Sequence, residues 1–264
     1  MAAAVPARGE HTARDFRPCA LIPIYNHKDT IAATVRALRS HGLPVTIVDD
    51  GSNEATRHIL DALAAQDTQV TLLRLPFNQG KGRALTAGLR ATQAAGFTHA
   101  LQIDADGQHD PADVPRFLAE SLAHPDAMIC GQPIYDDSVP RGRLYGRYVT
   151  HVCVWAETLS LELRDSMCGY RLYPLEATCA EIRRRAPPAR MDFDTEIAVR
   201  LIWRGVPVRN LTTRVIYPEN GLSHFRMLRD NLRISAMHTR LLLGMLPRAP
   251  GLLWRKRRSQ ACAD

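Results

Sequence analysis

The chain has 264 residues, of which 45% are hydrophobic and 23% charged, and this suffices for the full core of one large α/β domain. Its six cysteines include no CxxC pair, so the sequence suggests neither a zinc site nor a disulfide framework, and a reducing, cytoplasmic compartment fits best. The formal net charge of +7 suits an anionic partner, which is a nucleotide, a nucleic acid or an acidic membrane surface.

From Cys19 onward, short apolar runs alternate with helix-like stretches. This is the βαβ rhythm of a mostly parallel sheet with helices on both faces, so we predict a single α/β domain. Strands are expected at residues 19–25, 45–50, 70–75, 99–106 and 127–132, and helices at residues 30–40, 55–65 and 83–95, with a further segment after Pro111.

The second half of the chain has a different pattern. We expect a loop at residues 132–143, a turn at 165–174, a β-like stretch at 206–217, and helices at 145–161, 175–185, 193–204 and 224–245.

The sequence contains no run of about 18 apolar residues, which is the length that crosses a bilayer. We therefore do not expect an integral membrane protein.

Three parts of the chain are predicted to have separate roles. Residues 1–17 are broken by charges and prolines and should form a flexible tail rather than a signal peptide. The domain should span residues 18–225, with a nucleotide-binding half at 18–132 and an acceptor half at 133–225. Residues 226–264 should form a basic amphipathic helix and a tail.

Polar residues close several of the predicted strands, where ligands of an open parallel sheet bind. Asp49 and Asp50 follow a buried apolar strand in DDGS, and an unpaired charge would be costly there. The alternative is that Asp50 and Ser52 form a turn or cap the next helix.

The DADGQ segment gives a sharper signal. Asp104 and Asp106 flank one small residue at a strand end, so both carboxylates can converge on one cation and on a nucleotide attached to it. Hard oxygen ligands, with Gln108 as another, suit Mg or Mn. Such an ion neutralises a diphosphate and stabilises a leaving group. The alternative is an acidic loop solvated by water.

Between these motifs, residues 78–84 read NQGKGRA, a glycine-flanked basic turn that opens a helix. The turn can set backbone amides and Lys81 near phosphate, although it does not match a P-loop. A plain turn with a solvated lysine is the alternative. We expect Asp50 and Asp104 to meet beside it at one edge of the sheet.

The four motifs PxYN (23–26), DDGS (49–52), NxGKGxA (78–84) and DADGQ (104–108) together resemble family 2 glycosyltransferases of the GT-A fold, particularly the polyprenyl-phosphate sugar synthase branch. The similarity covers about residues 18–225. The resemblance implies that Pro23, Tyr25 and Asp50 line a base and ribose pocket, that Asp104 lies near the ribose and Lys81 borders the nucleotide, and that Asp106 with Gln108 holds a divalent cation, Mg or Mn.

The same resemblance implies an inverting transfer of a sugar from a nucleoside-diphosphate sugar to a lipid-linked or amphipathic acceptor at the cytoplasmic membrane face. A soluble or polyprenyl-phosphate acceptor is the alternative. Residues 165–171 resemble a DxxSGF/YR segment of that branch, with Cys168 in place of a small hydroxyl residue, which puts Asp165 and Arg171 beside the donor sugar and the acceptor. A buried Asp–Arg pair that orders a turn is the other interpretation.

Asp194 and Glu196 begin a predicted helix in a segment that resembles the acidic stretch near the acceptor site of the family. A carboxylate there can act as general base for an acceptor hydroxyl, whereas a phosphate acceptor needs none. Acidic residues in a first helical turn are also favoured by the helix dipole alone. His224, in a turn-like stretch at residues 218–225, is a further candidate contact for phosphate, and a capping role for Ser223 is the alternative.

The predicted C-terminal helix carries arginines at helical spacing beside apolar residues, and Trp254 is followed by four basic residues. This pattern suits an anionic membrane surface, and a helix packed on the core with a solvated basic face is the alternative. A nucleotidyltransferase is disfavoured because IPIYNHKDT replaces a glycine-rich basic signature near the first strand. We expect no nucleic-acid partner, because no aromatic-basic interleaving supports one.

Overall fold

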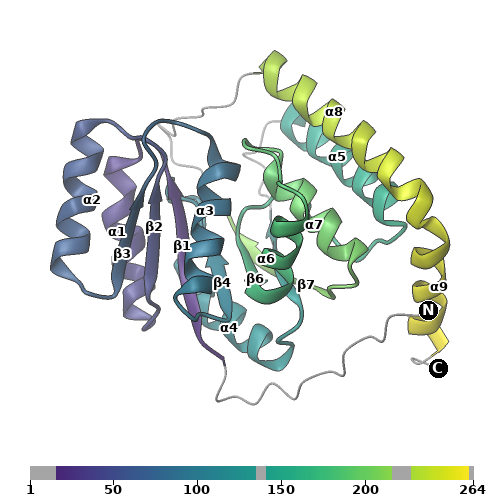
Figure 1. Cartoon of the computed structure of the whole chain (residues 1–264), viewed down its shortest axis with the longest axis horizontal. Helices are drawn as coiled ribbons and strands as arrows, with labels where there is room; N and C mark the ends of the chain where they lie inside the picture. The colour runs from purple at the N-terminus through teal and green to yellow at the C-terminus, as the bar shows by residue number, and fades with distance from the viewer. Residues whose placement is uncertain (1–15, 135–140, 216–226, 262–264) are drawn as a thin grey trace.

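A seven-stranded sheet forms the centre of the computed structural model, which describes residues 16–134, 141–215 and 227–261 (Figure 1). Its strands are β1 (Pro18–Ile24), β2 (Val45–Asp49), β3 (Val70–Arg74), β4 (His99–Gln102), β5 (Met128–Ile134), β6 (Arg171–Pro174) and β7 (Val208–Arg214). They lie in the order β3-β2-β1-β4-β6-β5-β7. The β1–β2, β2–β3, β1–β4 and β5–β7 pairs are parallel, and β6 runs antiparallel to both β4 and β5.

Helices cover both faces of this sheet. They are α1 (Lys28–Ser40), α2 (Glu54–Gln66), α3 (Lys81–Ala94), α4 (Val114–Ala123), α5 (Arg141–Thr158), α6 (Leu175–Arg184), α7 (Phe193–Trp203), α8 (Met227–Met245) and α9 (Ala249–Ala261), with short 3-10 turns η2 (Pro111–Asp113) and η3 (Leu246–Arg248). Apolar residues of α3, α6, α7 and α8 share one core cluster, and those of α1, α2 and α4 share the other. Side chains of β1 alternate between them: Leu21 enters the first core, and Ala20 and Ile22 enter the second.

The prediction of an α/β fold with a mostly parallel sheet is confirmed, and most predicted elements are found within a few residues of their expected bounds. The expected turn at 165–174 was wrong in its second part, because β6 occupies it. The expected loop at 132–143 is shorter, since β5 reaches Ile134 and α5 begins at Arg141; residues 135–140 lie outside the described ranges. None of the described helices is both long enough and apolar enough to span a bilayer.

The packing of α3 onto β1 and β2 explains a helical glycine. An ideal Cβ on Gly88 would lie 2.3 Å from Cδ1 of Leu21 and 2.9 Å from Cγ2 of Val48. Only a residue without a side chain lets α3 approach the sheet this closely. The approach brings the first turn of α3, with Lys81, to the carboxyl ends of the parallel strands.

We predict that Gly88→Ala destabilises the protein by about 1–3 kcal/mol through overpacking, although alanine is the better helix former. Gly146→Ala in α5 is the matched control, because a Cβ there meets nothing within 4 Å among the described residues. That change should leave stability unchanged or raise it by up to about 1 kcal/mol. Urea unfolding measures both, and equal effects of the two substitutions would contradict the proposed close packing.

Candidate active site

The first two motifs meet where β1 and β2 end. Asn26, with a positive φ of 61°, donates its backbone N–H to Oγ of Ser52 at 3.1 Å. Its side-chain oxygen accepts from the N–H of Asn53 at 2.8 Å, and Asn53 caps α2. Pro23 is buried at the end of β1, and Tyr25 beyond it is half-buried. The PxYN and DDGS segments therefore form one hydrogen-bonded edge.

Asp50 organises the glycine-rich turn. Its carboxylate is buried, and its two oxygens accept from the backbone N–H groups of Gln79 and Gly80, each at 2.7 Å. Burial raises the pKa of Asp50, and these two hydrogen bonds oppose the rise. Gly51 has a φ of +74°, and a Cβ on it would lie 2.5 Å from the backbone of Phe77. Asp50 thus fixes the turn that leads directly into Lys81.

Lys81 is the centre of the site. Its Nζ lies 2.8 Å from the Asp104 carboxylate and 3.0 Å from that of Asp194, which also accepts from Nε2 of Gln102 at 2.9 Å. A Cβ on Gly169 would lie 2.7 Å from Oδ2 of Asp104 and 2.9 Å from Nζ of Lys81. Segments far apart in sequence therefore converge on the ammonium group of Lys81. Asp50 contacts the glycine-rich turn at Gln79 and Gly80 and Asp104 contacts it at Lys81, so the two carboxylates meet beside one turn, as the sequence predicted.

The charges of this cluster stabilise one another. Burial alone would lower the pKa of Lys81, but Asp104 and then Asp194 outweigh it and raise that pKa above its usual range. Burial alone would raise the pKa of Asp104, but Lys81 and then His109 outweigh it and hold that pKa below its usual range. Both groups therefore stay ionised at neutral pH.

The DADGQ turn projects beyond β4. Oδ1 of Asp106 accepts from the N–H of Gln108 at 3.0 Å across Gly107, whose φ is +75°. Asp106 and Gln108 are both half-buried, so their oxygens are not sealed in the core. The hydroxyl of Thr30 on α1 donates to the carbonyl of Ala105 and braces the turn from the side.

The segment after α5 is held by an ion pair of the buried Asp165 that differs from the expected one. Asp165 accepts two hydrogen bonds from Arg147, at 2.6 and 2.7 Å, and lies 3.6 Å from Nε2 of His151. Arg171 is fully buried and donates to the carbonyl oxygens of Ser166, at 2.8 Å, and Asp194. An Asp165–Arg171 pair is therefore not formed among the described residues, and both side chains instead bond to the backbone of residues 166–168, just before Gly169.

The two predicted acidic residues of α7 face different neighbours. Asp194 points to Lys81, whereas Glu196 accepts from Arg200 at 3.3 Å and from Arg240 of α8. Residues two positions apart lie on nearly opposite sides of a helix, so they do not share one site. His224 and Ser223 lie outside the described residues.

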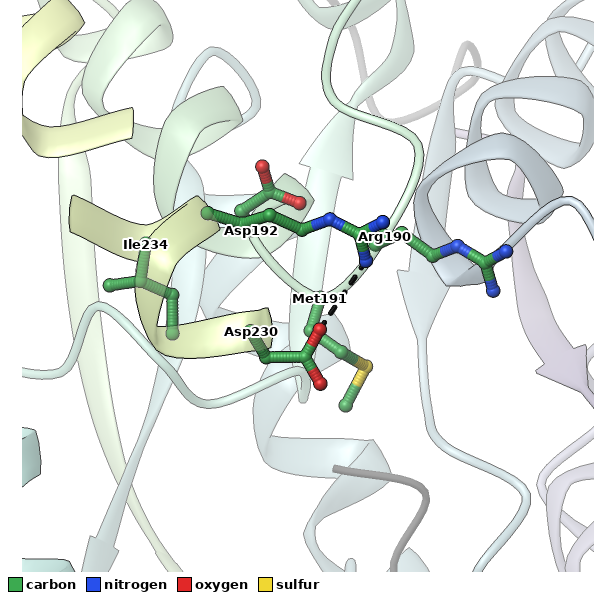
Figure 2. A pocket seen from close by; sticks show the side chains of 6 residues that line it. Arg190, Met191, Asp192, Asp230 and Ile234 are labelled. Atoms are coloured by element: carbon green, nitrogen blue, oxygen red, sulfur yellow. Dashed lines mark hydrogen bonds and ion pairs between the residues drawn. The ribbon is translucent and has the colours of Figure 1, made fainter. Parts of the chain in front are cut away.

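Arg190 contacts the glycine-rich turn and lines a pocket beside the C-terminal helix. Its guanidinium donates to Oδ1 of Asn78 at 2.6 Å. Figure 2 shows a small pocket between the segment before α7 and the first turns of α8, where Asp230 is ion-paired with Arg233 at 3.4 Å. The pocket is lined by Arg190, Met191, Asp192, Asp230, Arg233 and Ile234.

Four residues of the site were not singled out from the sequence. Gly169 is the glycine of the DxxSGF/YR segment, but its close approach to Asp104 and Lys81 is visible only in the structure. The contact of Arg147 with Asp165 is likewise visible only there, and Gln102 is one more polar residue in a strand. His109 directly follows DADGQ, and that adjacency was the available signal.

This geometry agrees with a comparison to protein-family models, because residues 19–186 match the model described as glycosyl transferase family 2. The chain belongs to glycosyl transferase family 2. The resemblance predicted from the four motifs is thereby confirmed.

Two relatives of this family 2 glycosyltransferase carry informative names. An undecaprenyl-phosphate mannosyltransferase from Micrococcus luteus is 32% identical over 168 residues, which cover 60% of this chain and 66% of the relative. A polyprenol monophosphomannose synthase from Mycolicibacterium smegmatis is 25% identical over 232 residues, which cover 82% of this chain and 83% of the relative.

Solved structures show the same fold at low identity. The mannosyltransferase PcManGT from Pyrobaculum calidifontis, in complex with GDP-Man and Mn2+, has a TM-score of 0.54 at 17% identity. The match covers 92% of this chain and 75% of the PcManGT chain. The S. aureus TarS 1–349 structure has a TM-score of 0.55 at 13% identity, and the match covers 88% of this chain and 71% of the TarS chain. The predicted GT-A fold class is confirmed by these likenesses.

We predict that Asp165→Asn lowers stability at pH 7 by about 1.5–3 kcal/mol, because the buried Asp165 loses its charge-assisted hydrogen bonds with Arg147, whose side chain is 20% exposed. Burial opposes the ionised form of Asp165, but His151 and Arg147 outweigh it and hold its pKa below the usual range. Its contribution is therefore present above the unfolded pKa of about 3.9 and lost as the pH falls through the folded pKa. The variant should lose less stability than the wild type on acidification below about pH 5.

Urea unfolding at a series of pH values measures this effect. Asp67→Asn is the control, because Asp67 also pairs with an arginine, Arg39, but its side chain is 36% exposed. Its loss should stay below about 1 kcal/mol. Similar losses in the two variants would show that burial of the Asp165 pair has no special effect.

Proposed function

We propose that this glycosyltransferase transfers a sugar, with inversion, from a nucleoside-diphosphate sugar to a polyprenyl phosphate at the cytoplasmic membrane face. The names of the Micrococcus and Mycolicibacterium relatives support a phosphorylated polyprenol as the acceptor. A hydroxyl acceptor would need a carboxylate as general base, and the observation that favours a phosphate acceptor is that the candidate carboxylates are buried and already paired.

All three carboxylates predicted as catalytic residues are buried and neutralised. Asp165, Asp194 and Glu196 are 3%, 4% and 2% exposed. Both oxygens of each have a hydrogen-bond donor or a cation beside them. A general base must offer a lone pair within about 2.6–3.2 Å of the proton that it removes. Among the described residues, these three groups are therefore better suited to positioning than to proton transfer.

A phosphate acceptor fits this arrangement because its attacking oxygen is already ionised at neutral pH. It can attack the anomeric carbon without a protein base, opposite the departing nucleoside diphosphate, and this geometry inverts the configuration. Asp194 then serves to hold Lys81, and Arg171 and Asp165 serve to hold the backbone around Gly169. The glycine leaves open the face of the Lys81–Asp104 pair that a side chain would cover.

The donor site fits a divalent cation. Asp106 and Gln108 offer hard oxygen donors on a half-buried turn next to Asp104, which is the donor chemistry that Mg and Mn prefer. When bound, the ion would neutralise the diphosphate and stabilise the leaving group. PcManGT, a likeness in fold, was solved with GDP-Man and Mn2+, which agrees with such a site. Pro23, Tyr25 and Asp50 border the adjoining edge and are proposed to shape the base and ribose pocket.

The C-terminal helices supply a surface for the membrane. Residues 227–261 contain eight Lys or Arg and one Asp, a formal charge of +7 that equals the net charge of the whole chain. The same segment exposes large apolar side chains, which are Leu232, Leu242, Leu243, Leu246, Leu253 and Trp254. Basic and apolar side chains together favour an anionic lipid surface, where each basic residue contributes about 1 kcal/mol.

We predict that the purified protein transfers sugar from at least one of GDP-mannose, UDP-glucose and UDP-N-acetylglucosamine to undecaprenyl phosphate in the presence of Mn or Mg. Undecaprenol, which lacks the phosphate, should not be an acceptor. Radiolabelled donor and lipid extraction measure both. Asp106→Ala should reduce the rate by at least about a hundredfold, since charge stabilisation of the leaving group is lost. Transfer to undecaprenol at the same rate would refute a phosphate acceptor.

We predict that the protein floats with vesicles containing phosphatidylglycerol and that the triple variant Leu243→Ser, Leu246→Ser, Trp254→Ser lowers the bound fraction by about tenfold or more. A double variant, Leu122→Ser with Leu161→Ser, is the control, because both leucines are exposed but lie outside the C-terminal helices. Equal flotation of the triple variant and the wild type would remove α8 and α9 from the membrane surface.

A further inference from the structure

His109 is a buried histidine beside the proposed donor site with no role in the scheme above. It is 8% exposed, and it follows the DADGQ turn directly. Its Nε2 lies 3.7 Å from Oδ2 of Asp104, the residue that begins the same turn. The side chain of His109, which comes directly after the turn, therefore reaches back to the first residue of the turn.

The ring of His109 is held from its other sides. It stacks on Tyr170 with the ring centroids 5.0 Å apart, and Tyr170 stacks on Phe117 of α4 at 4.4 Å. The hydroxyl of Tyr170 donates to the carbonyl of Asp110 at 3.3 Å, and the backbone of His109 bridges to Val215. The ring therefore has little freedom to turn away from Asp104.

The contact with Asp104 complements the one made by Lys81. Lys81 holds the carboxylate at 2.8 Å, and His109 approaches the same carboxylate at 3.7 Å, which is longer than an ordinary N–H···O hydrogen bond. Two residues therefore hold the Asp104 carboxylate in place, Lys81 at the start of α3 and His109 at the end of the turn. The position of Asp104 in turn sets where the chain starts toward Asp106 and Gln108.

We infer that His109 is a positioning residue of the donor site, which acts through Asp104 to fix the turn that presents Asp106 and Gln108 to the divalent cation and the nucleoside diphosphate. The inference rests on the proposed function. A histidine suits this role because its ring can stack on Tyr170 while its outer nitrogen faces a carboxylate. Phenylalanine keeps the ring without the nitrogen, and glutamine keeps an N–H at a similar reach without the ring.

Binding of GDP and of UDP, each with Mn2+, tests the inference by calorimetry on the wild type, His109→Phe and His109→Gln. Loss of a group that orients a ligand-holding residue typically lowers affinity by about tenfold to a hundredfold. His109→Phe should show such a loss for the nucleotide that the wild type binds, with a donor KM raised more than kcat is lowered. His109→Gln should recover most of the affinity.

His99→Phe is the matched control, because His99 is also a buried histidine but lies at the opposite end of β4, where its ring contacts Thr98 and the carbonyl of Pro125. It should lower Tm and leave nucleotide affinity unchanged. Wild-type affinity in His109→Phe, or equal losses of Tm and affinity in both His109 variants, would overturn the positioning role. A wild type that binds neither nucleotide would overturn the proposed function, and the inference with it.

Discussion

The ammonium group of Lys81, which is largely shielded between two carboxylates, joins the first and second halves of the chain in this glycosyltransferase. Lys81 begins α3, Asp104 follows β4, and Asp194 lies in the first turn of α7, so the ion pairs connect the first half of the chain to the second. The side chains of Lys81, Asp104 and Asp194 are 15%, 24% and 6% exposed, so removing one partner leaves a largely buried charge without its counterion, which destabilises the fold. The interaction that assembles the site therefore also fixes how the halves pack, with Gly169 as the residue that permits the approach.

The sequence predicted the sheet edge well, because parallel strands end at a common edge and their closing residues must meet there. It did not predict β6. That strand has only four residues, RLYP, and its first residue is an arginine that is fully buried. Arg171 is accommodated because the carbonyl groups of Ser166, five residues before it, and Asp194, 23 residues after it, accept from its guanidinium, and no pattern of polarity in the sequence reveals these backbone partners.

The side chains of the site were harder to predict than the backbone that carries them. Asp50 looked available to a ligand in the sequence. Its two oxygens instead accept from the N–H groups of Gln79 and Gly80, which lie 29 and 30 residues later in the chain. Asp194 and Glu196 looked equivalent in the first turn of one helix. Their different partners depend on the rotation of α7 about its axis, which is set by packing and not by the sequence of the helix alone.

The same rotation links the C-terminal helix to the site. Arg240 of α8 pairs with Glu196, while Met237 and Leu241 are buried against the core, so the inward face of α8 is fixed by both charge and apolar contact. Leu232 and Leu243 are eleven residues apart, or about three helical turns, and therefore share the opposite, exposed face. Figure 1 shows α5, α8 and α9 together at the end of the molecule away from α2. Because α8 is held to α7 by its inward face, the orientation of its exposed leucines is set relative to Asp194, and a membrane bound there would meet the active site in one defined geometry.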